Sequence, residues 1–323
     1  MIRKFQPEPK TNRVHVAVGV ITNQKNQVLI SKRHDHLHQG GLWEFPGGKL
    51  EHGESSETAL RRELLEELNI KIKDYRPLIA IPYDYEDKHV YLNVFKVMSF
   101  SGDVVSNEQQ KVLWVDIADL NKYTFPAAND AIVSALLLPD RYIITGSFES
   151  TEQCRHKIST AVEQSAGLIQ LRQKNMRDND YLELAKNLLE ITQPSNTRII
   201  LNSTLEIFLK TRADGLHFTG PRLRNCTQRP VAADKLFSVS THTLEELQHA
   251  VTIGADFAML SPVLPTQSHP GATALGWKKF NDIVHEIPIP VYALGGMKIE
   301  HLEQAWNQGA QGVAAISALW NDL

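Results

Sequence analysis

The sequence predicts an α/β protein of two domains, an α+β sandwich over residues 1–138 and a (β/α)8 TIM barrel over residues 139–323. Two observations support this prediction. The 323 residues are long for one domain, and the order of strand-like and helix-like segments changes near Pro139. Before Pro139, strand-like segments come in runs with few helices, which is typical of an α+β fold. After it, short aliphatic segments alternate with helical patterns, which is typical of parallel βαβ units.

The first domain is expected to contain strands in two runs, separated by a helix over residues 54–68. Turn-forming residues 23–26 join the first two strands. The apolar alternation predicts strands at Val14–Ile21, Gln27–Ser31, Leu78–Tyr83, Val90–Val97 and Leu113–Val115, and a closing helix at Ala127–Leu137.

The second domain repeats one pattern eight times. Its strand-like segments begin at residues 142, 168, 198, 215, 237, 257, 291 and 313. Helical patterns fill most of the gaps, among them Tyr181–Ile191, Thr243–Val251 and Ile299–Gly309. Eight such units predict a closed barrel, and an open doubly wound sheet is the alternative.

Composition argues against several classes of protein. The chain is 42% hydrophobic and 22% charged, which indicates a folded protein, and its net charge of −3 argues against tight binding to duplex nucleic acid. Cys154 and Cys226 form no C-x-x-C pair, so a reducing compartment is expected. The first residues lack the apolar segment of a signal peptide, and no apolar run is long enough to span a membrane. We therefore expect a soluble, cytoplasmic protein.

Residues 54–68 carry the most informative pattern, an amphipathic helix with clustered carboxylates. Positions i, i+3 and i+4 share one helix face, so Glu63, Glu66 and Glu67 lie on one stripe. Neighbouring carboxylates repel one another unless a cation neutralises them, and hard oxygen ligands suit Mg²⁺ or Mn²⁺. A solvated acidic helix face is the alternative.

The surroundings of these carboxylates resemble the Nudix box, G-x5-E-x7-R-E-U-x-E-E-x-G-U, in which U is aliphatic. The matching residues are Gly48, Glu54, Arg62, Glu63, Leu64, Glu66, Glu67 and Ile70. Asn69 replaces the last Gly, which is expected just past the helix end in the left-handed conformation that Asn tolerates well.

This resemblance implies a hydrolase of nucleoside diphosphates linked to another group. It implies that Glu63, Glu66 and Glu67 bind the divalent metal, with the Gly47 carbonyl as a further ligand. It also implies that Arg62 orients the neighbouring carboxylates through charge-assisted hydrogen bonds. An ordinary surface charge is the alternative for Arg62.

Two further strings, LWEFPGGK at residues 42–49 and FPAAND at residues 125–130, are similar to motifs of the MutT subgroup, which hydrolyses oxidised purine nucleoside triphosphates. The resemblance implies cleavage of 8-oxo-dGTP to 8-oxo-dGMP and pyrophosphate, which keeps oxidised guanine out of DNA. Glu108 corresponds to a further carboxylate near the metals or the attacking water, with an exposed loop residue as the alternative. The residues expected to contact the nucleotide are Arg33, His38, Glu44, Phe45, Pro46, Gly47, Lys49 and Asn129.

Asn129 is the residue expected to recognise the oxidised base. Oxidation of guanine turns the N7 acceptor into an N–H donor, and a buried amide discriminates that change because a mismatch leaves polar groups unpaired. The alternative for Asn129 is a helix N-cap, since Asn129-Asp130 precedes a helical pattern. The alternative for Phe45 is a place in the core.

The second domain resembles thiamine phosphate synthases and their TenI-like relatives. The resemblance lies in QLRQK at residues 170–174, SVSTHTLEE at 238–246, PTQSHPG at 265–271, ALGGM at 293–297 and VAAIS at 313–317. It implies a phosphate or ligand site at the carboxyl ends of the barrel strands. The candidate residues of that site are Gln170, Arg172, Lys174, Asn202, Thr266, Ser268, Gly295, Gly296 and Ser317.

Several positions depart from the synthase pattern. Synthases have an Asn-Asp pair where this chain has Asn202-Ser203, and an acidic residue where it has HFTGPRLR at residues 217–224. Both lost positions are family Mg²⁺ ligands. The phosphate-binding segment has lost its Lys, and TenI-type tautomerases have a His where Pro262 stands. His217 and His269 are possible substitutes, although a lone His is more often structural. We therefore expect a barrel that retains a phosphate site with a changed or lost reaction.

Three functional hypotheses follow. The leading one is a Mg²⁺-dependent (or Mn²⁺-dependent) 8-oxo-dGTP diphosphatase with a nucleoside triphosphate substrate. The alternative is a Nudix enzyme that acts on a diphosphate of thiamine metabolism, which the fusion favours. In the third, the barrel is a non-catalytic module that binds a phosphorylated thiazole or thiamine ligand. None of them involves a stable complex with nucleic acid or a membrane.

Overall fold

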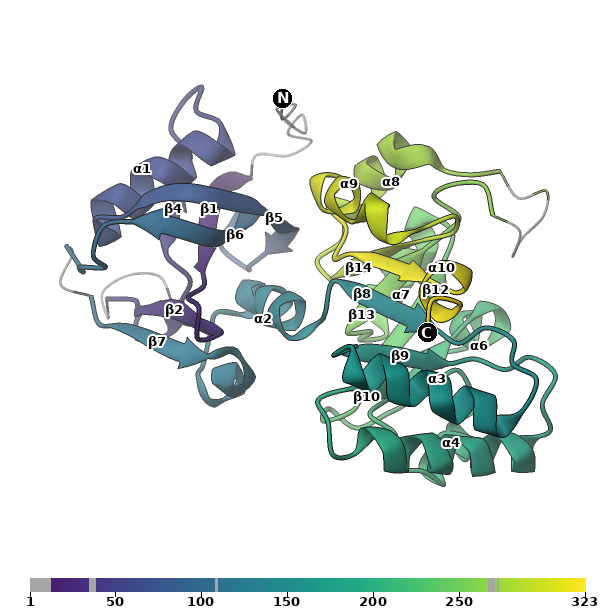
Figure 1. Cartoon of the computed structure of the whole chain (residues 1–323). Helices are drawn as coiled ribbons and strands as arrows, with labels where there is room; N and C mark the ends of the chain where they lie inside the picture. The colour runs from purple at the N-terminus through teal and green to yellow at the C-terminus, as the bar shows by residue number, and fades with distance from the viewer. Residues whose placement is uncertain (1–12, 35–38, 108–109, 267–270, 272) are drawn as a thin grey trace. The chain divides into compact units, whose positions relative to one another are not determined.

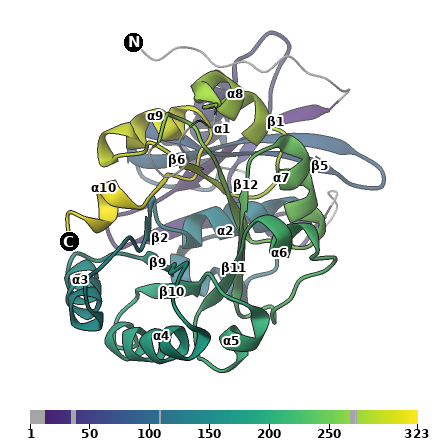
Figure 2. The ribbon, with the colours of Figure 1, turned by 90° about the vertical axis from the view of Figure 1, so that its right-hand side faces the viewer.

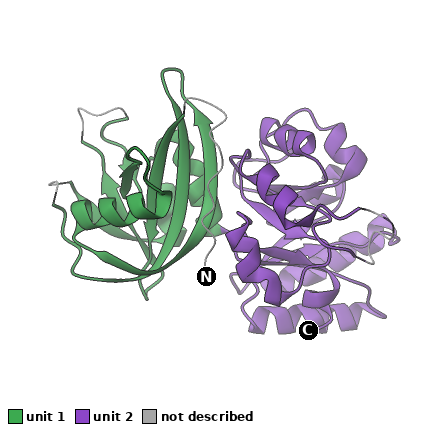
Figure 3. Cartoon of the chain, turned by 90° about the horizontal axis from the view of Figure 1, so that it is seen from above, with its two compact units in different colours: residues 1–137 green, residues 138–323 purple. Residues whose placement is uncertain are grey.

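The computed structural model divides the chain into two units, Met1–Leu137 and Leu138–Leu323 (Figure 3). It describes residues 13–34, 39–107, 110–266, 271 and 273–323. The predicted fold class is confirmed: an α+β sandwich is followed by a closed barrel of parallel strands. No helix among these residues is long and apolar enough to cross a membrane.

The first unit contains two sheets, ordered β4-β1-β6-β5 and β3-β2-β7. Its elements are β1 (Val14–Ile21), β2 (Gln27–Lys32), β3 (Trp43–Glu44), β4 (Gly47–Lys49), α1 (Ser56–Leu68), β5 (Lys71–Asp84), β6 (His89–Ser101), β7 (Val112–Asp116), the 3-10 helices η1 (Ile117–Lys122) and η2 (Ala127–Asn129), and α2 (Asp130–Leu137).

The structure adds three features to the predicted elements of this unit. The strands β3 and β4 have only two or three residues, too few to produce a periodic pattern. The hairpin of β5 and β6 is longer than predicted, because strand pairing continues into segments with many polar residues. The expected helix over residues 127–137 begins as the 3-10 turn η2 and becomes α-helical at Asp130.

Strand β1 separates two hydrophobic cores, because successive side chains of a strand point to opposite faces. Ala17 and Ile21 pack with the buried leucines of α1, whereas Val18 and Val20 pack in the core that includes residues of β2 and α2. At Gly19, an added Cβ atom would lie 2.8 Å from Leu64 Cδ1, so the glycine permits close approach of α1. The acidic helix is thereby held against the strands that carry the glycine pair of the Nudix box (Figure 1).

The second unit is a barrel whose parallel strands close in the order β10-β11-β12-β13-β14-β15-β8-β9, with helices around it (Figures 1 and 2). Its strands are β8 (Arg141–Ile144), β9 (Leu168–Leu171), β10 (Arg198–Leu201), β11 (Gly215–Phe218), β12 (Leu236–Thr241), β13 (Phe257–Leu260), β14 (Val291–Leu294) and β15 (Val313–Ala315). Its helices are α3 (Thr151–Glu163), α4 (Asp178–Thr192), α5 (Leu205–Leu209), α6 (Gly220–Arg224), α7 (Leu244–Thr252), α8 (Gly276–Val284), η3 (Ile299–His301), α9 (Leu302–Asn307) and α10 (Ser317–Trp320).

Aromatic side chains fill part of the barrel interior. Tyr142, Phe257 and Tyr292 are fully buried, and their ring centroids are 5.5–5.7 Å apart. Such a barrel is a packed core rather than a pore, so ligands bind at its strand ends.

Candidate functional site

The acidic helix α1 is defined at both ends by local hydrogen bonds. The hydroxyl of Ser55 accepts a hydrogen bond from the Thr58 N–H at 3.2 Å and caps the amino end. At the carboxyl end Asn69 adopts the left-handed conformation, with φ 56° and ψ 30°. The prediction that Asn69 takes the place and conformation of a glycine is confirmed.

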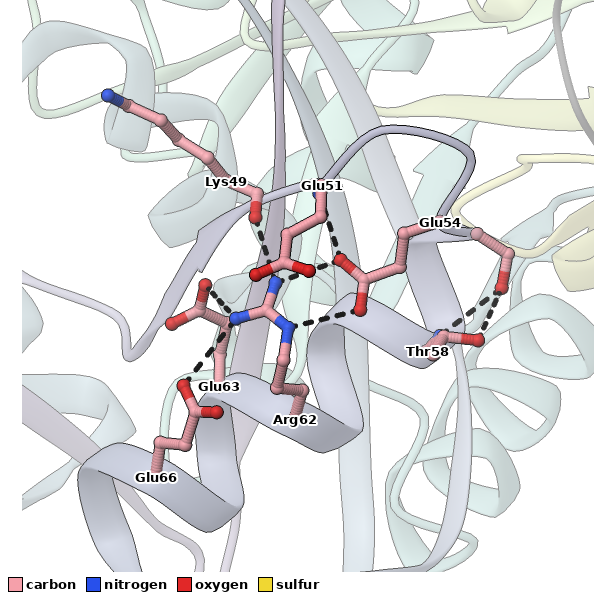
Figure 4. Close-up of polar contacts among 8 residues, drawn as sticks. Lys49, Glu51, Glu54, Thr58, Arg62, Glu63 and Glu66 are labelled. Atoms are coloured by element: carbon pink, nitrogen blue, oxygen red, sulfur yellow. Dashed lines mark hydrogen bonds and ion pairs between the residues drawn. The ribbon is translucent and has the colours of Figure 1, made fainter.

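Arg62 is the centre of the ion-pair network on α1 (Figure 4). Its guanidinium donates to both carboxylate oxygens of Glu54, from Nε at 3.1 Å and from Nη2 at 2.8 Å. Nη1 donates to Glu63 Oε1 at 2.7 Å and lies 3.5 Å from Glu66 Oε2. The hydrogen bonds between Arg62 and Glu54 raise the pKa of the arginine and lower the pKa of the carboxyl group. Arg62 therefore holds these carboxylates in a fixed arrangement.

Two carboxylates of α1 meet the backbone of β4. The Gly47 N–H donates to Glu67 Oε2 at 3.1 Å. The Glu63 carboxylate lies directly against Gly48, where an added Cβ atom would be only 2.0 Å from Glu63 Cδ. The two glycines therefore let the strand approach the helix closely enough to bring both carboxylates beside one short stretch of backbone.

Glu66 differs from the other two carboxylates because its side chain is 60% exposed and faces Arg62. In the part of the chain that the structure describes, no three acidic, histidine or cysteine side chains are already grouped for metal binding. These residues nevertheless have the chemistry that a divalent cation needs. Glu63 and Glu67 supply carboxylate oxygens beside β4, and Glu66 lies one helical turn from Glu63.

The glycine pair gives a prediction with two distinguishable results. In Gly48→Ala the new methyl group displaces the end of the Glu63 side chain, so kcat should fall about tenfold while the melting temperature changes little. In Gly47→Ala the methyl group meets the Ala17 carbonyl oxygen at 2.1 Å, at a φ of 144°. This variant should be destabilised by about 2–4 kcal/mol. Thermal unfolding and steady-state kinetics on both proteins test the pair, and full activity of Gly48→Ala would contradict the role of its contact with Glu63.

The residues expected on the nucleotide side lie on and beside the short strands. Arg33 directly follows β2, and its Nη1 donates to Glu44 Oε2 on β3. Lys49 ends β4 and is exposed. Burial and the nearby charges of Lys49 and Arg33 lower the pKa of Lys88, which lies in the turn between β5 and β6. Lys88 was not predicted, because no sequence motif distinguishes it and only the hairpin brings it to these cations.

Asn129 and Phe45 have different surroundings. Asn129 ends η2, directly before α2, and is 8% exposed. Phe45 is 3% exposed and stacks on Phe125, with centroids 5.4 Å apart and rings 8° from parallel. Phe45 therefore packs in the core, the alternative that the sequence left open, and its contact with the nucleotide stays a prediction. The neighbouring Pro46 is also buried, and its carbonyl accepts from Gly19.

Four sequence-predicted positions lie outside the described residues. They are His38 and Glu108 in the first unit and Ser268 and His269 in the second. Their roles stay predictions.

The barrel candidates that the structure describes line one cavity of about 730 Å³ at the carboxyl ends of the strands. These residues are Gln170, Arg172, Lys174, Asn202, Thr266, Gly295, Gly296 and Ser317. Both glycines have positive φ, and a Cβ atom at either would lie 2.7–2.8 Å from atoms of the 262–265 segment. The backbone therefore approaches that segment more closely than any other residue type permits.

Arg222 and Tyr181 also line this cavity, although sequence reasoning did not select them. Arg222 lies in the segment HFTGPRLR at residues 217–224. That segment stands out in the sequence because it lacks the acidic residue of the synthases, and its arginines carry no motif. His217 is fully buried between Ser238 Oγ at 2.8 Å and Ser240 Oγ at 2.9 Å. Burial, with the charges of Arg222 and Arg172, lowers the pKa of His217 to about 3. His217 is therefore neutral at physiological pH and has the structural role that was its alternative.

The two units match two separate families. Residues 17–135 match the family model of the NUDIX domain, and residues 141–319 match that of thiamine monophosphate synthase. The first unit is 34% identical over 124 residues to the 8-oxo-dGTP diphosphatase of Escherichia coli (strain K12), a match that covers 38% of this chain and 96% of that protein. The second is 31% identical over 180 residues to a thiamine-phosphate synthase of Ruminiclostridium cellulolyticum, covering 55% of this chain and 86% of that protein.

A solved structure gives a further similarity for the first unit. It comes from a study of MutT from Aliivibrio salmonicida and Vibrio cholerae, and it is 40% identical to this chain with a TM-score of 0.35, covering 39% of this chain and 97% of that one. The chain therefore belongs to two families, to the Nudix pyrophosphohydrolases through its first unit and to the thiamine monophosphate synthase and TenI family through its second.

Proposed function

We propose that the first unit hydrolyses 8-oxo-dGTP to 8-oxo-dGMP and pyrophosphate with Mg²⁺ or Mn²⁺, and so removes an oxidised nucleotide from the cytoplasmic pool before it enters DNA. The observation that carries this proposal is the placement of Glu63 and Glu67 beside the glycines of β4, and the low exposure of Asn129 supports it. The similarity to the Escherichia coli 8-oxo-dGTP diphosphatase supports the same substrate.

The phosphate end of the substrate is assigned to α1 and β4. Glu63, Glu66, Glu67 and the Gly47 carbonyl would hold the divalent cation, which when bound neutralises the polyphosphate and activates the attacking water. Arg62 keeps Glu63 in position through its hydrogen bond at 2.7 Å, and Glu54 in turn anchors Arg62 with two hydrogen bonds. The network holds the carboxylates close together, as a cation site requires.

The base and sugar end is assigned to the residues around β2, β3 and η2. Asn129 offers both a donor and an acceptor, which match the O6 acceptor and the N7–H donor of 8-oxoguanine. Guanine has an acceptor at N7, so the carbonyl oxygen of the amide would face another acceptor and the contact would be lost. Arg33, Lys49 and Lys88 add positive charge toward the phosphates, and the Glu44 contact orients Arg33.

A second candidate places a diphosphate of thiamine metabolism in the same hydrolase site. The observation that favours it is the presence of a thiamine monophosphate synthase family barrel in the same chain. In either case we assign the barrel cavity to a small phosphorylated ligand, because Gly295 and Gly296 line it without side chains and Arg172 supplies positive charge.

Comparison of three substrates tests the assignment. The full-length protein with Mg²⁺ would be given 8-oxo-dGTP, dGTP and hydroxymethylpyrimidine diphosphate, and kcat/KM measured for each. We expect kcat/KM for 8-oxo-dGTP to exceed that for dGTP by at least about a hundredfold. Equal values for the two nucleotides would rule out the oxidised purine as the preferred substrate, and a higher value for the pyrimidine diphosphate would favour the second candidate.

A further inference from the structure

The barrel cavity is lined by cations with almost no opposing carboxylate. Its lining includes four basic residues, Arg172, Lys174, Arg222 and Lys298. Among the described lining residues, one is acidic, Asp178. Asp178 is exposed in the first turn of α4. A small site with this balance of charge attracts an anion and repels a divalent cation.

Arg222 is held in place by two linked side-chain amides, of which Gln170 is buried. Its Nη2 donates to Asn202 Oδ1, and the Asn202 amide in turn lies 3.5 Å from Gln170 Oε1. Gln170 is 1% exposed, and its Nε2 donates to the Tyr142 hydroxyl at 3.0 Å. The guanidinium also lies 5.8 Å from the centre of the Phe218 ring. Arg222 is therefore oriented by the barrel interior rather than free to swing in solvent.

No acidic side chain among the described residues forms an ion pair with Arg222 or Arg172. Burial lowers the pKa of both guanidinium groups, although an arginine remains charged at physiological pH. Both charges also contribute to the lowered pKa of His217, so the two cations act on the same part of the barrel interior. Half-buried cations of this kind are stabilised by a bound anion.

The Mg²⁺ that the synthase family implies does not fit these residues. Magnesium requires several oxygen ligands, usually carboxylates. Asn202 Oδ1 already accepts from Arg222, and the buried Ser203 hydroxyl donates to the Thr204 carbonyl at 3.1 Å. A metal ion near Asn202 would also lie against a guanidinium of like charge.

We infer that the barrel binds the phosphate or diphosphate group of its ligand without a metal ion, with the guanidinium of Arg222 as the principal counter-charge beside Arg172. This inference rests on the proposed phosphate site of the barrel and gives it a specific recognition group. Arg222 suits the role because a guanidinium offers a planar fork of donors that matches two phosphate oxygens. The bond to Asn202 engages Nη2, and Arg222 is among the residues that line the cavity.

Calorimetric titration with inorganic pyrophosphate tests the inference. The experiment uses the full-length protein with the substitution Glu67→Gln, so that the hydrolase site contributes little to pyrophosphate binding. The buffer contains EDTA, which removes divalent metal ions. We expect pyrophosphate to bind in EDTA and Arg222→Ala to raise Kd by at least about tenfold, the value of a lost charged hydrogen bond. Arg224→Ala is the matched control, because Arg224 lies on the same helix α6, is exposed and does not line the cavity. Its Kd should stay within about twofold of the parent.

Two further measurements separate a binding role from a structural one. Arg222→Gln retains a donor for Asn202 without the charge, so it should melt near the parent temperature and still bind weakly. Excess Mg²⁺ should leave the parent affinity unchanged or lower it, because Mg²⁺ competes for pyrophosphate. Binding that appears only with Mg²⁺, or equal affinities for the Arg222→Ala and Arg224→Ala proteins, would overturn the inference. Absence of pyrophosphate binding both in EDTA and in Mg²⁺ would instead reject the barrel phosphate site. None of these binding results bears on the proposed hydrolysis of 8-oxo-dGTP by the first unit.

Discussion

Replacement of Glu67 by glutamine is expected to lower kcat for 8-oxo-dGTP by about a hundredfold, and by no less than about tenfold. Glutamine has nearly the same shape, and its carbonyl oxygen can still accept the Gly47 N–H, so the position of β4 against α1 should be kept. What is lost is a charged oxygen ligand in a site whose function depends on holding a divalent cation. The Mg²⁺ concentration needed for half-maximal rate should rise in parallel.

Glu57→Gln is the matched control for this variant. Glu57 lies on the same helix but in its first turn, three turns before Glu67. Its replacement removes one negative charge from α1 without touching β4, so kcat should stay within about twofold of wild type. Turnover of Glu67→Gln at the wild-type rate and the wild-type Mg²⁺ requirement would show that this carboxylate is not a metal ligand.

Replacement of Asn129 by alanine is expected to lower the ratio of kcat/KM for 8-oxo-dGTP to that for dGTP by at least about tenfold. Asn129 is 8% exposed and ends η2 directly before α2, and we expect its replacement to affect recognition of the base more than the start of α2. The decrease in kcat/KM should fall on 8-oxo-dGTP, because only 8-oxoguanine presents the N7–H donor to the amide oxygen. The kcat/KM for dGTP should change by less than about threefold.

Asn121→Ala serves as its control. Asn121 is exposed on η1, in the same unit, and its replacement should leave the selectivity ratio unchanged. Melting temperatures of both variants show whether a change in rate reflects loss of folded protein. If Asn129→Ala retains the wild-type ratio with a lower melting temperature, the residue has a structural role and the recognition of the base lies elsewhere.

Much of the fold was predictable because its signals are local. The strand β1 has the predicted bounds, Val14–Ile21, since its apolar side chains and flanking turn residues define it. The eight barrel strands were predicted from short aliphatic segments that alternate with helices. The two-residue strand β3 and the 3-10 start before α2 were not predicted, because elements of two or three residues contain less than one period of any pattern.

The residues of the candidate sites also divide into those with a local sequence signal and those without one. Arg62 and its carboxylates were predictable as a group because their spacing on one helix brings them together. Lys88 and Arg222 were not, because each reaches its site through contacts between segments far apart in the sequence. The assignment of Phe45 to the core likewise depends on Phe125, eighty residues later in the chain.

The sequence by itself determined the acidic helix, its end at Asn69 and its family resemblance. Helical periodicity places Glu63, Glu66 and Glu67 on one face, and the left-handed Asn69 ends the helix through bonds to residues within one turn. Only the tertiary structure decided what these side chains meet. It placed Gly47 and Gly48 under Glu67 and Glu63, and it placed the guanidinium of Arg222 beside Asn202 in the barrel cavity. The physical reason is that periodicity depends on backbone geometry alone, whereas these contacts depend on strand register and on the path of the chain between them.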